Sequence, residues 1–136
     1  MTLPEISAWL VTQNIGVANV TIFEDFMPPT PNSCVTVIEY GGRSAPDVRV
    51  FGQAEIAREY PRVQILVRGE PDDYVTPRLK AQDAMRAMTR IMTTTLSSVN
   101  YYTSTPIQSV FPLVRDDLRR YVFAFNVELF KAVSTT

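Results

Sequence analysis

The side chains that most often carry chemistry in proteins are scarce in this sequence. Its 136 residues include no histidine, one cysteine and only two lysines, Lys80 and Lys131. Without histidine the chain cannot build a Ser-His-Asp or Cys-His triad or a His-ligated metal site, and it lacks the commonest general base. An enzyme mechanism would have to use carboxylates, lysine or tyrosine. These absences argue against an enzyme.

Two pairs of neighbouring carboxylates, Asp72-Asp73 and Asp116-Asp117, are candidates for acid–base or metal chemistry. The first pair lies at the start of a predicted helix, where a carboxylate caps free N–H groups and complements the helix dipole. The second pair lies in a tight turn between two predicted strands, a position that favours Asp. Cys34, the only thiol, has no disulfide partner and is expected to be a small buried hydrophobe. The sequence also lacks a Gly-rich phosphate loop, so we expect no catalytic residue, cofactor or metal site.

The overall composition is that of one globular domain. Hydrophobic residues make up 46% of the chain and the net charge is -1, so we expect a single domain over residues 1–136. A nearly neutral charge argues against a specific nucleic-acid-binding protein, which would show a basic surplus. The first residues do not resemble a signal peptide, and no apolar run approaches the ~20 residues that cross a bilayer. We therefore expect a cytoplasmic chain with no membrane partner.

The elements that position these residues are predicted from hydrophobic periodicity. Residues 2–14 have the pattern of a short amphipathic helix. Residues 19–26 and 33–40 are β-branched and aromatic runs, which predict strands. The proline-rich segment "MPPTPN" (27–32) between them predicts a stiff turn and hence an antiparallel hairpin. A strand over 61–69 follows a longer connection.

A long helix and two further strands complete the chain. Apolar residues at helical spacing predict a helix over 70–98, followed by strands at 108–116 and 119–130. The last strand has one strongly apolar face, which is expected to pack on the helices. Pro112 lacks a backbone donor and predicts that its strand lies at an edge or breaks at a bulge. The order α-β-β-β-α-β-β predicts an α+β fold, a largely antiparallel sheet with two helices packed on one face.

Several sequence blocks are informative when they are taken together in their order along the chain. After the N-terminal helix come "VTIFEDFMPPTPNSCVTVIEYGG", "YPRVQILVRG", the helix "DDYVTPRLKAQDAMRAMTRI" and the closing hairpin "FPLVRDDLRRYVFAFNVELF", which cover nearly the whole chain. They are packing and turn patterns, and together they resemble the tail terminator, tail-completion or minor capsid proteins of long-tailed bacteriophages. The resemblance implies a structural virion protein without a cofactor. It implies a hexameric ring, assembled in the host cytoplasm, that caps the tail tube at its head-proximal end and joins head-completion proteins.

A ring of identical subunits needs a heterologous interface, in which one surface of a subunit meets a different surface of the next. We expect contributions from the connection over residues 41–60, the basic face of the main helix and exposed sheet edges. This connection carries both signs of charge, which suits subunit pairing better than phosphate binding. We interpret it as an ordered arm against a neighbouring subunit or the tail tube. The candidate interface residues are Arg43, Asp47, Arg49, Glu55, Arg58, Glu59, Arg62, Arg68, Arg86, Arg90, Asp116 and Asp117.

Three alternatives remain open at the level of the sequence. Another head-tail joining protein or a tail-tube subunit would share the structural class and differ in its neighbours. A small carboxylate-dependent enzyme would hold a buried acidic pair with raised pKa values in a pocket. A nucleic-acid-binding module would show strong, salt-dependent affinity for DNA.

Overall fold

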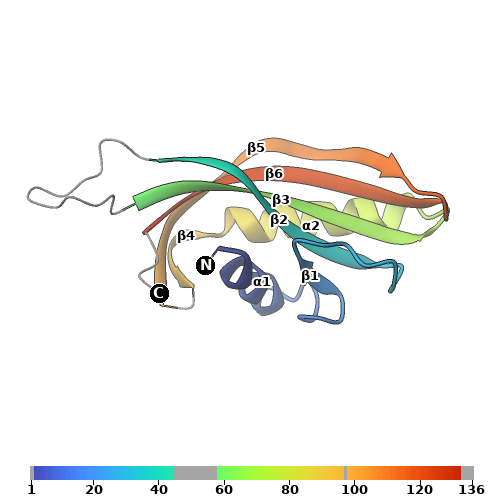
Figure 1. The fold of residues 1–136 in the computed structure, drawn as a ribbon, viewed down its shortest axis with the longest axis horizontal. Helices are drawn as coiled ribbons and strands as arrows, with labels where there is room; N and C mark the ends of the chain where they lie inside the picture. The colour runs from blue at the N-terminus through green and yellow to red at the C-terminus, as the bar shows by residue number, and fades with distance from the viewer. Residues whose placement is uncertain (1, 45–57, 97, 133–136) are drawn as a thin grey trace, which may run out of the picture.

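The structure, a computed structural model, describes residues 2–44, 58–96 and 98–132 (Figure 1). The α+β class is confirmed, and the expected order of elements gains one strand. No helix in these ranges is long and apolar enough to cross a membrane. The elements are α1 (Thr2–Thr12), β1 (Ile22–Glu24), β2 (Cys34–Ser44), β3 (Arg58–Pro71), α2 (Val75–Thr89), β4 (Met92–Leu96), β5 (Val99–Arg115) and β6 (Arg120–Ala132).

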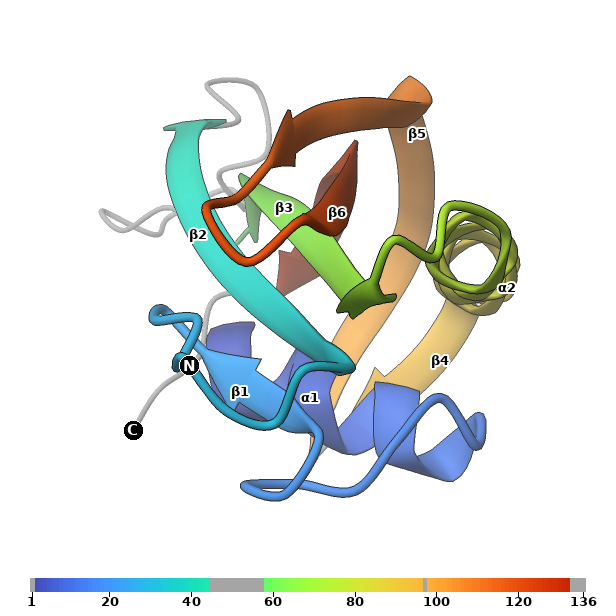
Figure 2. The ribbon, with the colours of Figure 1, turned by 90° about the vertical axis from the view of Figure 1, so that its right-hand side faces the viewer.

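The strands form one curled, mixed sheet in the order β1-β2-β3-β6-β5-β4 (Figure 2). Four of the pairings between neighbours are antiparallel, whereas β1 runs parallel to β2, with Ile22 opposite Val35. The predicted antiparallel hairpin between the first two strands is therefore wrong. Because β1 has only three residues, the connection over residues 25–33 is long enough to lead the chain back and start β2 in the same direction.

Both helices pack into the same core on one face of the sheet, as predicted. The apolar face of β6 points into this core, where burial of each large side chain contributes about 1.5–3 kcal/mol. Alanines on the inner face of α2 allow the helix to approach the sheet closely. The fully buried residues of β6 and α2 here are Phe123, Phe125, Val127, Leu129, Ala81, Ala84, Ala87 and Met88.

A smaller apolar cluster lies on the other face of the sheet. Leu66 of β3 packs there with Val122 and Ala124 of β6. Partly buried side chains from β2, β5 and the proline-rich turn cover this cluster. The two central strands are therefore apolar on both faces, which explains why Leu66 interrupts the polar alternation of β3.

The helix predicted over residues 70–98 is shorter in the structure. It ends at Thr89, and residues 92–96 form β4, which pairs with the start of β5. Three consecutive threonines in β4 favour the strand because β-branched side chains fit a pleated surface. The expectation for Pro112 is confirmed: the ladder shifts register beside it, and β5 lies at the edge of the sheet beyond Thr103.

The connection between β2 and β3 is shorter than the predicted 41–60 segment. Strand β2 continues past its glycine pair to Ser44, and β3 begins at Arg58. A register shift in the β2–β3 ladder accommodates the glycine pair, as a β-bulge does. Residues 45–57 lie outside the described residues, so their interpretation as an arm stays a prediction.

Candidate subunit interface

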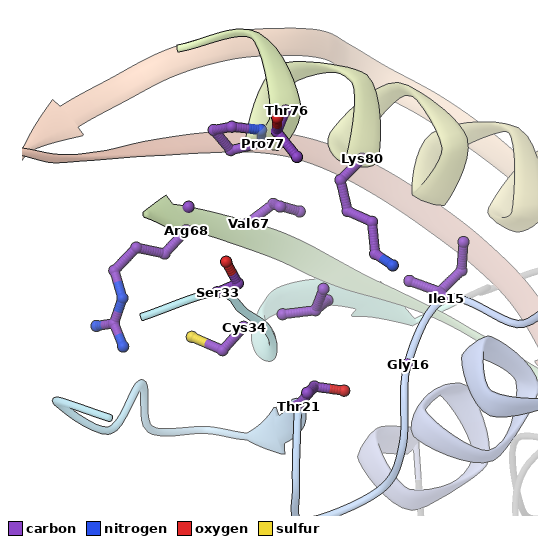
Figure 3. Close-up of a pocket in the computed structure, with 12 residues that line it drawn as sticks. Ile15, Gly16, Thr21, Ser33, Cys34, Val67, Arg68, Thr76, Pro77 and Lys80 are labelled. Carbon is purple, nitrogen blue, oxygen red and sulfur yellow. The ribbon is translucent and has the colours of Figure 1, made fainter. Parts of the chain in front are cut away.

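A small apolar cavity lies between the start of α2 and strand β2 (Figure 3). Its volume of about 220 Å³ is below the roughly 300–1,000 Å³ of most ligand pockets. Cys34 lines the cavity and is buried, as predicted, and burial raises the pKa of its thiol. Lys80 points toward Ile15, and none of the described residues that line the cavity is a carboxylate. The cavity therefore holds neither an activated nucleophile nor an acid–base pair.

The first acidic pair organises the start of α2. Asp73 Oδ1 accepts a hydrogen bond from the Thr76 backbone N–H at 3.1 Å, which lowers the pKa of Asp73. Asp72 forms ion pairs with Arg115 at 2.7 Å and Arg119 at 3.3 Å. These contacts cap the helix and tie it to the β5–β6 hairpin. Across residues 2–44, 58–96 and 98–132, no group of three His, Cys, Asp or Glu residues is placed to hold a metal ion.

The second acidic pair shapes the turn between β5 and β6. Asp116 Oδ1 accepts the backbone N–H groups of Leu118 and Arg120 at 3.0 and 2.9 Å. Its other oxygen accepts Arg120 Nε at 2.8 Å. Burial raises the pKa of Asp116, but these hydrogen bonds outweigh burial and leave the pKa below its usual value. Asp117 lies exposed in the same turn.

Two buried arginines hold the proline-rich turn against the sheet. Arg68 is 5% exposed, and its Nη2 donates to the carbonyl oxygens of Pro28 and Pro31 at 2.6 and 2.7 Å. Its Nε donates to a third carbonyl at 2.9 Å. Arg120, also buried, donates to the carbonyl of Pro29 at 2.7 Å. A proline-rich segment has carbonyl acceptors but few N–H donors, and the two guanidinium groups supply those donors.

The predicted interface residues of the sheet make contacts within the chain. Arg62 Nε lies 3.0 Å from Glu128 Oε2 on the neighbouring strand. Glu59 lies 3.6 Å from the ammonium group of Lys131. Arg68 stabilises the turn described above, so we do not include it in the interface that we propose.

The predicted residues of the main helix lie at its surface. Arg86 is exposed and pairs with Asp83 at 3.2 Å, an exposed contact that contributes little to stability. Arg90 Nη1 donates to Gln13 Oε1 at 2.8 Å, which links the end of α2 to the segment that follows α1. Both guanidinium groups remain accessible to another molecule.

The remaining candidates lie at or beyond the ends of β2 and β3. Arg43 and Arg58 belong to these strands, and the structure describes their strand pairing but not their side chains. Asp47, Arg49 and Glu55 lie outside the described residues. Their part in an interface stays a prediction.

The sequence analysis missed exposed apolar side chains, which occur toward opposite ends of the sheet. Single exposed apolar residues are ordinary, whereas groups of them mark contact sites. Near β1 the most exposed is Phe26, at 68%; on β5 and its turn it is Leu118, at 57%, and Met92 of the neighbouring β4 is 71% exposed. The two groups are Val17, Val20 and Phe26 beside β1, and Ile107, Leu113, Val114 and Leu118 on β5 and its turn.

The fold defines the chain as a small α+β protein built on one curled, mixed sheet. A family model described as bacteriophage tail terminator protein matches residues 10–131. The chain therefore belongs to the bacteriophage tail terminator family. Its members are structural virion proteins and not enzymes, so the predicted resemblance is confirmed.

Solved structures share this fold. A chain from the virion of a native gene transfer agent particle aligns with a TM-score of 0.62 and 14% identity, over 93% of this chain and 94% of that one. A second protein aligns with a TM-score of 0.53 and 8% identity, over 98% of this chain and 91% of the other. At these identities the likeness concerns the fold alone. A search of curated proteins finds no match.

Proposed function

We propose that this protein terminates the phage tail by forming a hexameric ring on the head-proximal end of the tail tube. The ring stops tube growth and offers a surface to head-completion proteins. The observation that carries the proposal, beside family membership, is the pair of different exposed apolar groups toward opposite ends of one sheet.

Two different contact sides fit a closed ring. A head-to-tail contact joins the β1 side of one copy to the β5 side of the next, and a suitable rotation closes the chain of contacts. Closure covers both apolar groups on every copy, which explains why a small protein carries them. The two flat faces of the ring are then free for different partners, the tail tube on one and head-completion proteins on the other.

The test is growth of tail tubes from purified tube protein in the presence of this protein. We expect shorter tubes, each with a ring at one end in negative-stain images, and a ring mass of about six subunits. Tubes of unchanged length, with no added density at either end, would contradict the proposal.

Another head-tail joining role is the main competing function. A pull-down separates the two, because a terminator binds assembled tubes and a head-completion protein binds head components without them. A chain that polymerises into tubes by itself would instead be a tube subunit.

A further inference from the structure

The outer face of α2 is basic and exposed. Arg78, Arg86 and Arg90 lie on this face, and Asp83 is the one exposed carboxylate of the helix. Two apolar side chains one turn apart, Val75 and Leu79, are exposed at its first half. The inner face of the helix is fully used, since its alanines and Met88 pack in the core. We call this outer surface of Val75, Arg78, Leu79, Arg86 and Arg90 the basic helix face.

The β1–β2 edge of the sheet is acidic. Glu24 pairs in register with Val37, and Glu39 lies two residues further along β2, a rise of about 7 Å. Asp25 follows Glu24, and the exposed ring of Phe26 comes next. All three carboxylates are exposed. We call Glu24, Asp25, Phe26 and Glu39 the acidic edge.

These charges are not neutralised within the described chain. The ion pairs of residues 2–44, 58–96 and 98–132 include neither the three carboxylates of the acidic edge nor Arg78. The pair between Arg86 and Asp83 is exposed on both sides and can exchange partners at little cost.

The two surfaces lie on different sides of the molecule. Helix α2 packs on β3, β5 and β6, whereas β1 and β2 pack on α1. Figure 2 shows α2 on the right of the molecule and β1 and β2 on the left. One copy therefore cannot bring its own acidic edge to its own basic helix face, but two copies can.

We propose that the acidic edge of one copy docks on the basic helix face of a second copy. This contact deepens the proposed function and rests on it: helix α2 packs on β5, so the basic helix face lies on the β5 side that meets the β1 side of the next copy. Opposite charges select the partner surface and the orientation, and Phe26 adds apolar contact with Val75 and Leu79. A second copy is the fitting partner because each chain carries one surface of each kind, so the same contact repeats around a ring.

A charge exchange between two variants tests the contact. The edge variant carries Glu24→Arg and Glu39→Arg, and the helix variant carries Arg78→Glu and Arg86→Glu. Each alone should raise the protein concentration for half-assembly by roughly tenfold or more, because like charges then face each other. A mixture of the two should form rings in which the variants alternate, and all four substitutions in one chain should restore self-assembly.

Mass photometry and light scattering measure these assemblies, and the urea midpoint of each variant checks folding. Asn100→Arg is the control, since it adds an exposed charge in the β4–β5 hairpin, which belongs to neither surface. It should leave the ring mass unchanged. The assembly of the wild type should weaken as salt is added, as for any charge-directed contact.

Three outcomes would overturn the proposal, and they separate it from the ring itself. Edge and helix variants that assemble like the wild type would remove this contact and leave the ring intact. Folded variants that remain apart when mixed would show that the two surfaces do not meet each other. A wild-type chain that stays monomeric in solution and on isolated tails would overturn the ring together with the contact.

Discussion

Lys131 Nζ lies 3.0 Å from Glu5 Oε1, and this ion pair joins the last strand to the first helix inside the core. The two side chains are 1% and 5% exposed. Tyr101 donates its hydroxyl to the same carboxylate oxygen at 2.6 Å, and Lys131 also donates to Thr2 Oγ1 at 3.2 Å. Lys131, one of the two lysines, therefore has a structural role: it links the last strand to the first helix, near the two ends of the chain.

Substitution of Lys131 should destabilise the fold strongly. Lys131→Met leaves the Glu5 carboxylate buried beside fewer donors, and such a loss costs about 3–5 kcal/mol in the free energy of unfolding. Urea denaturation measures this loss of stability. Lys80, which lines the small cavity, supplies the control: Lys80→Met should change stability by about 0.5 kcal/mol or less. Equal losses in the two variants would contradict a special role for the buried pair.

The same carboxylate should make stability depend on acidic pH. Burial raises the pKa of Glu5, but hydrogen bonds from Tyr101 and Lys131 outweigh it and hold the pKa below its usual 4.5. A carboxyl group with a lowered pKa in the folded state stabilises the fold above its usual pKa, and this contribution is lost as the pH falls through the folded-state value. The free energy of unfolding, from urea titrations at several pH values, should therefore fall below about pH 4.5.

Glu5→Gln is the matched variant for this pH dependence. It lacks the titrating group, so its stability should fall less steeply in acid than that of the wild type, although Asp116 still contributes in the same direction. Identical slopes for the two proteins would contradict the assignment.

Gly69 should not tolerate a larger residue. A Cβ at this position would lie 2.6 Å from Cγ of Pro77 and 2.8 Å from its Cδ, in the first turn of α2. Gly69→Ala therefore forces the helix start to shift, and we expect a loss of about 1–3 kcal/mol by urea denaturation. Gly41→Ala is the control, because no atom lies within 4 Å of its added Cβ. A loss at Gly41 as large as that at Gly69 would argue against the clash.

The proline-rich turn should depend on the fork of the Arg68 guanidinium. Arg68→Lys keeps the charge but cannot reach three carbonyl oxygens together, so buried acceptors lose donors at a cost of about 1–3 kcal/mol. Arg62→Lys is the control, because Arg62 is half-exposed and makes one ion pair, with Glu128. Its loss should be below about 1 kcal/mol. Thermal and urea unfolding compare the stabilities of the two variants. A larger loss in Arg62→Lys than in Arg68→Lys would contradict the role of Arg68 in holding the proline-rich turn.

The sequence by itself determined the features that depend on local patterns. The alternation in β6, the inner face of α2 and the cap by Asp73 follow from residue types at fixed spacing, and the structure has all three. The lack of histidine and the ordered sequence blocks pointed to a structural tail protein, as the family match confirms. These inferences needed no knowledge of which segments meet in space.

Only the tertiary structure decided which strands pair and which charged residues are buried. The parallel β1–β2 pair and the additional strand β4 depend on neighbours that local periodicity does not specify. Arg68 has the position of a solvent-facing residue in β3, yet the turn 36 residues earlier in the chain covers it. Lys131 is buried because Glu5, 126 residues away, is folded against it. The burial of a charge depends on such distant partners, and a sequence pattern reports only near ones.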